Sequence, residues 1–249
     1  DKMKIVTEIP GPKSKELLKR FNDAKCCGLG VNNGVFIKRA SGAMFEDVDG
    51  NVFLDCIGGI GVQNIGYSNP EVIQAIKDQA DLFTHSMINV VQYEGYVKLC
   101  EKLNAITPGS FKKRTALFNS GAEAVDNAVK IARMATGRRE VIAYTGAFHG
   151  RTGLAVSLTS RVRPYKFNTG PMAPSIHRIP YPYCYRCPYD KERETCGLFC
   201  LKAYEDVLID MVDPSEVAAI VLEAVQGDGG FMAVPKEYMT GLRKICDKY

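Results

Sequence analysis

From Thr115 onward the chain alternates short apolar runs with helical patterns, and this alternation restricts the fold more than any other feature. We predict buried strands at residues 115–118, 141–144, 176–179 and 217–222. We predict helices at residues 121–135, 198–210 and 235–248, and in the first of these apolar residues recur every three or four positions. Strands that alternate with helices predict an α/β fold, a mostly parallel sheet with helices on both faces.

The earlier part of the chain carries different signals. Asp49-Gly50 lies between two apolar runs and predicts a β-hairpin over residues 44–55. Helices are predicted at residues 14–23, from Pro70 onward and at residues 93–104. We expect residues 1–66 to form the N-terminal segment of a small domain. Residues 67–249 would then be part of a large domain, with a Cys-rich insertion at 181–200.

Polar or glycine-rich groups follow three of the predicted strands. Ser120-Gly121 follows the first, residues 148–151 follow the second, and Glu223 with residues 226–228 follows the fourth. Ligands in open α/β sheets bind beyond the carboxyl ends of the strands. This coincidence predicts a binding site at that edge.

Ser120 and Glu123 form the S-x-x-E pattern of a capping box, so a helix is expected to begin at Ser120. Gly121 and Ala122 leave the first backbone N–H groups uncovered. Those groups lie at the positive end of the helix dipole, so the turn can hold a phosphate. Taken alone, the same residues also describe an ordinary capped turn between a strand and a helix.

The order and spacing of three motifs resemble the class III pyridoxal-phosphate aminotransferases. The motifs are Asn119-Ser120-Gly121-Ala122-Glu123-Ala124, Phe148-His149-Gly150-Arg151-Thr152 and Glu223-Ala224-Val225-Gln226-Gly227-Asp228-Gly229-Gly230. Gly58-Gly59-Ile60 and Thr84-His85-Ser86 also fit the N-terminal pattern of this family. The resemblance runs from about residue 45 to residue 249 and is closest to the 4-aminobutyrate aminotransferases.

The resemblance implies a fold type I enzyme that uses pyridoxal 5'-phosphate. The residues expected to bind this cofactor are Ser120, Gly121, Ala122, Phe148, His149 and Glu223. The first three would hold its phosphate, and Phe148 would lie flat against its ring. Plainer interpretations are a core aromatic for Phe148, a structural histidine for His149 and a strand-end charge for Glu223.

The same resemblance implies transfer of an amino group from an ω-amino acid, such as 4-aminobutyrate, to a 2-oxo acid, first of all 2-oxoglutarate. Arg151 would bind the substrate carboxylate, because a guanidinium grips a planar carboxylate with two hydrogen bonds. Ile60 would contact the carbon chain, although its glycine-rich segment also fits a plain flexible loop. Asp228 would lie at the substrate, where many aminotransferases of this group carry Glu. Asp followed by Gly-Gly resembles the amino-acid racemases and epimerases of the family, which is the alternative activity.

Three functional groups of the family have no counterpart here. The Asp that pairs with the ring nitrogen, the lysine that binds the cofactor covalently and an arginine for an α-carboxylate all lie further along the family's chain. Lys112, Lys130 and Lys166 do not match the context of that lysine. We therefore expect the N-terminal portion of a longer enzyme, with the C-terminal part of the fold missing and no catalytic residue of its own. The complete enzyme is expected to be a homodimer.

The predicted insertion contains a separate candidate site. Cys184-x-x-Cys187 and Cys196-x-x-x-Cys200 place four thiols in one short segment. Such a set could hold zinc or an iron–sulfur cluster, or it could be a loop of free thiols. A non-catalytic partial domain whose cysteines bind metal is thus a further hypothesis.

Composition narrows the class of protein. The 32 basic and 28 acidic residues give a formal net charge of +4, which suggests neither a nucleic-acid nor a membrane partner. No apolar run is long enough to span a membrane, and no signal-peptide core follows Lys4. Nine cysteines, an odd number, argue against a complete set of disulfides. We expect a soluble cytoplasmic protein.

Overall fold

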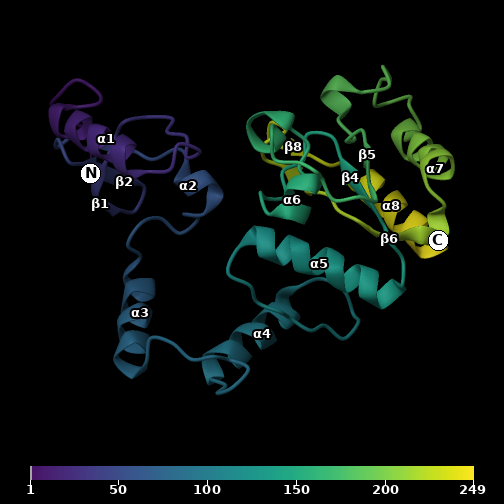
Figure 1. Ribbon diagram of the computed structural model, residues 1–249, viewed down its shortest axis with the longest axis horizontal. Helices are drawn as coiled ribbons and strands as arrows, with labels where there is room; N and C mark the ends of the chain where they lie inside the picture. The colour runs from purple at the N-terminus through teal and green to yellow at the C-terminus, as the bar shows by residue number, and fades with distance from the viewer. Residues whose placement is uncertain (1) are drawn as a thin grey trace. The chain divides into compact units, whose positions relative to one another are not determined.

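The computed structural model describes residues 2–249 and divides into two compact units, Asp1–Leu99 and Cys100–Tyr249 (Figure 1). These units reflect packing within the chain, and a domain division after residue 66 stays a prediction. The first unit contains α1 (Pro12–Ala24), β1 (Ile37–Ser41), β2 (Met44–Asp47), β3 (Val52–Leu54), α2 (Gly58–Gly61), α3 (Pro70–Leu82) and the start of α4 (Glu94–Ile106).

The predicted hairpin joins β2 to β3 in an antiparallel sheet of order β1-β2-β3. Gly50 has φ 90°, a conformation that favours glycine. The buried Asp47 carboxylate closes the turn by accepting from the backbone N–H groups of Asp49 at 2.9 Å and Asn51 at 2.8 Å. The predicted start of α3 is also confirmed, because the Asn69 side chain accepts from the N–H groups of Glu71 and Val72.

The second unit contains the predicted parallel sheet. Its elements are α5 (Gly121–Thr136), β4 (Glu140–Tyr144), α6 (Gly153–Leu158), the π-turn η1 (Val162–Lys166), β5 (Ile176–Ile179), η2 (Cys184–Arg186), α7 (Phe199–Met211), η3 (Pro214–Glu216), β6 (Val217–Ile220), β7 (Val225–Gln226), β8 (Met232–Ala233) and α8 (Lys236–Lys248). The strands run parallel in the order β5-β4-β6. Figure 1 shows β4 between its two neighbours.

The central strand β4 buries both of its faces, because successive side chains of a strand point to opposite sides of the sheet. Ile142 and Tyr144 pack against residues of α7 and α8, including Leu208, Tyr238 and Leu242. Val141 and Ala143 pack against Val129 of α5 and Leu158 of α6. Helices therefore cover both faces of the sheet, as predicted.

Tyrosines dominate the face of the sheet that α7 and α8 cover. Tyr144, Tyr181, Tyr204 and Tyr238 are all buried there. The hydroxyls of Tyr144 and Tyr238 lie 2.9 Å apart and share a hydrogen bond. Burial raises the pKa of each of these two phenols.

The predicted strand at residues 115–118 does not form. No strand is assigned between α4 and α5, and within the described residues no neighbouring strand pairs with this segment. The Thr115 side chain instead donates to Asn104 Oδ1 of α4 at 2.9 Å. An apolar run becomes a strand only when its N–H and C=O groups find a ladder partner.

Among residues 2–249, no helix has the length and apolar character needed to cross a membrane.

Candidate active site

The first turn of α5 has the geometry predicted for a phosphate-binding turn. Ser120 is extended, and its Oγ accepts from the Glu123 N–H at 3.1 Å. Glu123 Oε2 in turn accepts from the N–H of Asn119, the residue before the N-cap, at 2.7 Å, so the carboxylate reaches back one residue further than in a standard capping box. The helix therefore begins at Gly121, with its first amides directed out of the end of the helix.

Two amides of this turn remain available to an anion. In the described part of the chain, neither the Gly121 N–H nor the Ala122 N–H has a hydrogen-bond acceptor. A Cβ built on Gly121 would meet nothing within 4 Å, so the space beside this amide is open. The positive end of the helix dipole and two free donors suit a phosphate group.

The loop after β4 lies directly on this turn. Gly150 has φ 130°, and a Cβ built there would lie 2.7 Å from the Ala122 Cβ and 2.9 Å from the Ala155 Cβ. Only glycine allows such a close approach. A second link is the Ala155 N–H, which donates to Asp126 Oδ1 of α5 at 2.8 Å. The fold thus brings the Phe148–Arg151 segment to the start of α5.

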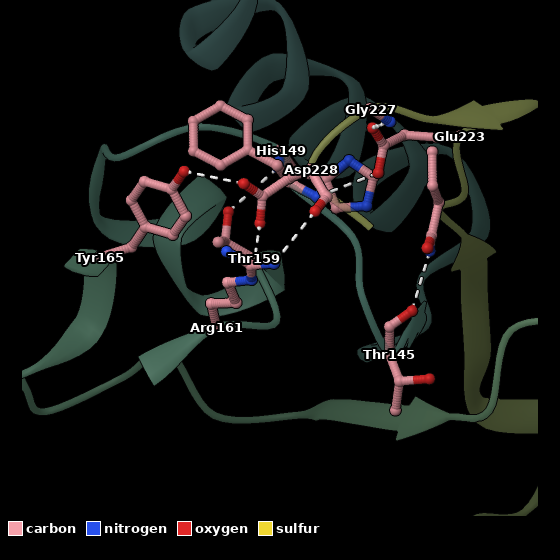
Figure 2. A network of polar contacts seen from close by, with 10 residues as sticks. Thr145, His149, Thr159, Arg161, Tyr165, Glu223, Gly227 and Asp228 are labelled. Carbon is pink, nitrogen blue, oxygen red and sulfur yellow. Dashed lines mark hydrogen bonds and ion pairs between the residues drawn. The ribbon is translucent and has the colours of Figure 1, made fainter. Parts of the chain in front are cut away.

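Glu223 joins the segment after β6 to the loop after β4. Its Oε2 accepts from the Phe148 N–H at 3.0 Å, and its Oε1 accepts from the Gly227 N–H at 3.2 Å. The buried Gln226 side chain donates to the Thr145 carbonyl at 2.8 Å. Figure 2 labels Thr145, Glu223 and Gly227, and its dashed lines mark hydrogen bonds between the residues drawn. The ends of β4 and β6 therefore meet as predicted, and the start of α5, which follows an irregular segment instead of the predicted strand, lies against the loop after β4.

His149 is buried and electrically neutral at ordinary pH. Its backbone N–H donates to Thr159 Oγ1 at 3.0 Å. Its Nε2 atom is buried and has no hydrogen-bond partner among residues 2–249. Burial, reinforced by the charge of Arg178, lowers the pKa of the His149 imidazole to about 4.

Arg151 presents a guanidinium beside two aromatic rings. Its central carbon lies 6.0 Å from the centroid of the Phe148 ring and 5.6 Å from that of Tyr165. The two rings are themselves in contact, with centroids 4.8 Å apart. Of the carboxylates that the structure describes, none lies within ion-pair distance of Arg151. The guanidinium is therefore available to an external carboxylate.

Asp228 lies in this region but already has partners. Its Oδ1 accepts from the Tyr165 hydroxyl at 3.0 Å, and its Oδ2 lies 3.3 Å from Arg161 Nε. Arg161 Nη2 also donates to the Asp228 carbonyl oxygen at 3.3 Å. Tyr165 and Arg161 are not among the residues predicted from the sequence. The available signal was one aromatic residue within the basic segment 161–166 that follows a buried helix.

Ile60, the other residue predicted to contact substrate, lies in α2 of the first unit. Its backbone is left-handed, with φ 59°, and its side chain is exposed. Its role toward the carbon chain of a substrate stays a prediction.

The four candidate metal ligands lie around one small cavity of about 20 Å³, which Cys184, Cys187, Cys196 and Cys200 line together. Within residues 2–249, however, no group of three or more Cys, His, Asp or Glu side chains is placed to hold a metal ion. Burial raises the pKa of the Cys184 and Cys200 thiols, which disfavours the thiolate form that binds metals. The predicted zinc or iron–sulfur site thus finds no support here.

Comparisons with a family model and with individual proteins place the chain in the same family. Residues 29–249 match the family described as Aminotransferase class-III. The chain is 46% identical over 246 residues to the 4-aminobutyrate aminotransferase of Mycobacterium bovis, covering 98% of this chain and 55% of that protein. It is 40% identical over 239 residues to the 5-aminovalerate aminotransferase DavT of Pseudomonas putida, covering 95% and 54%.

A solved structure agrees with the sequence comparison. The taurine:2-oxoglutarate aminotransferase of Bifidobacterium kashiwanohense, in complex with PLP and glutamate, is 28% identical and superposes with a TM-score of 0.82. The match covers 99% of this chain and 55% of that one. The chain spans about half the length of the curated relatives it matches.

Proposed function

Because the chain belongs to the class III aminotransferase family, we propose that it forms the phosphate- and carboxylate-binding part of an ω-amino-acid aminotransferase. The complete enzyme would move an amino group from a substrate such as 4-aminobutyrate to a 2-oxo acid, first of all 2-oxoglutarate. The observation that carries the proposal is the meeting of the ends of β4 and β6 with the start of α5. They bring together a helix start with free amides and a guanidinium without a described carboxylate partner.

The residues at this edge fit pyridoxal phosphate. The amides of Gly121 and Ala122, with the Ser120 hydroxyl, would hold the phosphate, and the space beside Gly121 leaves room for it. Phe148 would lie against the ring, and His149 would lie beside it. The buried His149 imidazole stays neutral at ordinary pH, so it adds no charge next to the ring.

The bound cofactor would supply an electron sink at the substrate carbon that loses or gains the amino group. The chain's own residues orient the reactants. Glu223 holds the backbone of Phe148 and Gly227 together, which fixes the loop that carries Phe148 relative to the segment after β6. Gly150 keeps that loop in contact with the phosphate turn.

The guanidinium of Arg151 supports ω-amino acids as the substrate class. An ω-amino acid carries its carboxylate at the end of the carbon chain away from the reacting amine. A planar guanidinium binds such a carboxylate with two charge-assisted hydrogen bonds. The names of the M. bovis and P. putida relatives, for 4-aminobutyrate and 5-aminovalerate, agree with this chemistry.

Properties of the whole protein rest on the same proposal. Because the matches cover about half of each relative, we place the covalent lysine and the ring-nitrogen Asp outside residues 1–249. We also propose a homodimer that works in the cytoplasm.

The test is steady-state kinetics of the complete enzyme with 4-aminobutyrate and 2-oxoglutarate. Replacing Arg151 by Ala is expected to raise KM for 4-aminobutyrate about 100-fold, as expected for loss of a bidentate charged contact. Arg186→Ala is the matched control, because Arg186 also lies over an aromatic ring, at 5.9 Å from Tyr185, outside this site. An unchanged KM in Arg151→Ala would refute the carboxylate assignment.

The same preparation separates transamination from racemisation. Transamination of a single amino-acid enantiomer requires the 2-oxo acid, whereas racemisation proceeds without it. Loss of optical activity in the absence of 2-oxo acid would overturn the aminotransferase proposal in favour of a racemase or epimerase.

A further inference from the structure

Tyr165 contacts Phe148 and Arg151, which the proposed function uses, and Asp228, which the sequence predicts to lie at the substrate. It lies in η1, half-buried, 14 residues beyond Arg151 in the sequence. Its hydroxyl donates to Asp228, its ring packs on Phe148, and the Arg151 guanidinium lies over the same ring. Figure 2 shows Tyr165 and Arg161 converging on Asp228.

The hydroxyl of Tyr165 provides one of the polar partners of the Asp228 carboxylate. One carboxylate oxygen accepts from this hydroxyl at 3.0 Å, and the other lies 3.3 Å from Arg161 Nε. Arg161 also donates to the Asp228 carbonyl, which holds the guanidinium on this residue. The negative charge of Asp228 is thus paired with a cation other than Arg151.

The ring of Tyr165 restricts Arg151. A guanidinium is attracted to the faces of aromatic rings, and Arg151 lies within 6.0 Å of two of them. A long side chain that is held in one region loses less conformational entropy when it binds a ligand. The rings do not use the in-plane N–H donors that a carboxylate needs.

We propose that Tyr165 is a positioning residue with two separable roles. Its ring holds Arg151 ready for a substrate carboxylate, and its hydroxyl, with Arg161, keeps Asp228 from pairing with Arg151 in competition with that carboxylate. The inference rests on the proposed function, because it takes Arg151 as the carboxylate-binding residue.

The test measures binding rather than turnover. Pentanoate, a carboxylate without an amine, is titrated calorimetrically into the complete, cofactor-loaded enzyme. Tyr165→Phe keeps the ring but frees Asp228, and we expect about tenfold weaker binding of pentanoate, the effect of one hydrogen bond to a charged group. Tyr165→Leu also removes the ring and is expected to weaken binding by about a further threefold, as for an exposed cation–π contact.

A double variant separates this role from a general structural one. Asp228→Asn in the Tyr165→Phe background removes the competing charge, so pentanoate affinity should return to within about threefold of the original value. Failure of this rescue would overturn the role of the hydroxyl. Unchanged affinity in both Tyr165→Phe and Tyr165→Leu would overturn the whole inference.

Arg151→Ala distinguishes this failure from failure of the proposed function. If Arg151→Ala leaves pentanoate binding unchanged, the carboxylate assignment is wrong and the inference falls with it. If Arg151→Ala weakens binding but the Tyr165 variants do not, the assignment stands and only the positioning role is refuted. Inorganic phosphate binding to the cofactor-free protein should be equal in all variants, which confirms that the turn at Ser120 is intact.

Discussion

Two polar clusters of the second unit are held in opposite ways. The edge cluster, consisting of Glu223, Asp228, Arg161 and Tyr165, joins segments that lie 63 to 75 residues apart in the chain. The thiol cluster, Cys184, Cys187, Cys196 and Cys200, lies in one short segment that runs from the loop after β5 into the first turn of α7. Hydrogen bonds and an ion pair connect the members of the edge cluster to remote segments, whereas the thiols line one small cavity and Cys196 donates to the nearby Arg193 carbonyl at 3.5 Å.

The difference concerns what each cluster contributes to the fold. The edge cluster forms only when remote strand ends have come together, so its hydrogen bonds stabilise the tertiary structure directly. The thiols are neighbours because of local sequence, and their side chains can change with little effect elsewhere. Stability measurements on matched variants should therefore separate the two clusters.

The largest effect is expected for Glu223→Ala. This change removes the acceptor for two backbone amides, those of Phe148 and Gly227. Each hydrogen bond to a charged group contributes about 1.5–3 kcal/mol, so the free energy of unfolding should fall by about 4 kcal/mol. Urea denaturation of the complete protein measures it, with Glu223→Gln as a milder variant that keeps the shape. A loss below about 1 kcal/mol would remove the contrast between the clusters.

The second-largest effect is expected in the pH dependence of the free energy of unfolding, through the buried imidazole of His149. Its folded pKa of about 4 lies below the ordinary 6.5, so the unfolded chain binds more protons between these values. The folded state therefore keeps its full free energy of unfolding above pH 6.5. Part of that free energy is lost as the pH falls through 4, because the unfolded chain takes up the proton more readily. The difference amounts to about 3 kcal/mol. Denaturation midpoints from pH 7 to 4 should fall less steeply in His149→Gln, and an equal slope would contradict the assignment.

A smaller effect is expected at the helix start. Ser120→Ala removes the acceptor for the Glu123 N–H and should destabilise the protein by about 1 kcal/mol. Ser120→Thr keeps the oxygen and serves as the control. Phosphate binding to the cofactor-free protein should weaken in the alanine variant only. Equal behaviour of the two variants would show that the cap is not formed.

The smallest effect is expected in the thiol cluster. Replacing Cys184, which is exposed, and Cys187, which is half-buried, by Ser should change the free energy of unfolding by less than about 0.5 kcal/mol per site, as for most positions outside the core. Chelator should leave the denaturation midpoint of the unmodified protein unchanged. One tightly held zinc per chain, measured after purification without chelator, would reverse the comparison and restore the metal hypothesis.

The edge cluster was partly predictable because topology, rather than local spacing, brings it together. Alternating strands and helices imply that strand ends share one edge, and the capping box at Ser120 marks where α5 begins. Tyr165 was not predictable in this way. Its position depends on the path of the η1 turn, which no periodic pattern encodes.

Two predictions failed or lost support for a related reason. Residues 115–118 have the composition of a strand, but a strand needs a neighbour, and the sequence of one segment does not specify its partner. The spacing of Cys184 and Cys187 is typical of metal sites, but spacing along the chain does not fix the distance between sulfur atoms. In both cases the missing information is tertiary.

The tyrosine layer beneath α7 and α8 has an optical consequence. The chain contains 12 tyrosines and no tryptophan, so its ultraviolet signals come from phenols. Tyr181 donates to the Glu223 carbonyl at 3.0 Å, which ties this layer to the strand end that carries Glu223, and burial raises its pKa to about 12. Exposed phenols should therefore ionise first in an alkaline absorbance titration. The buried tyrosines should contribute no absorbance change until the protein unfolds.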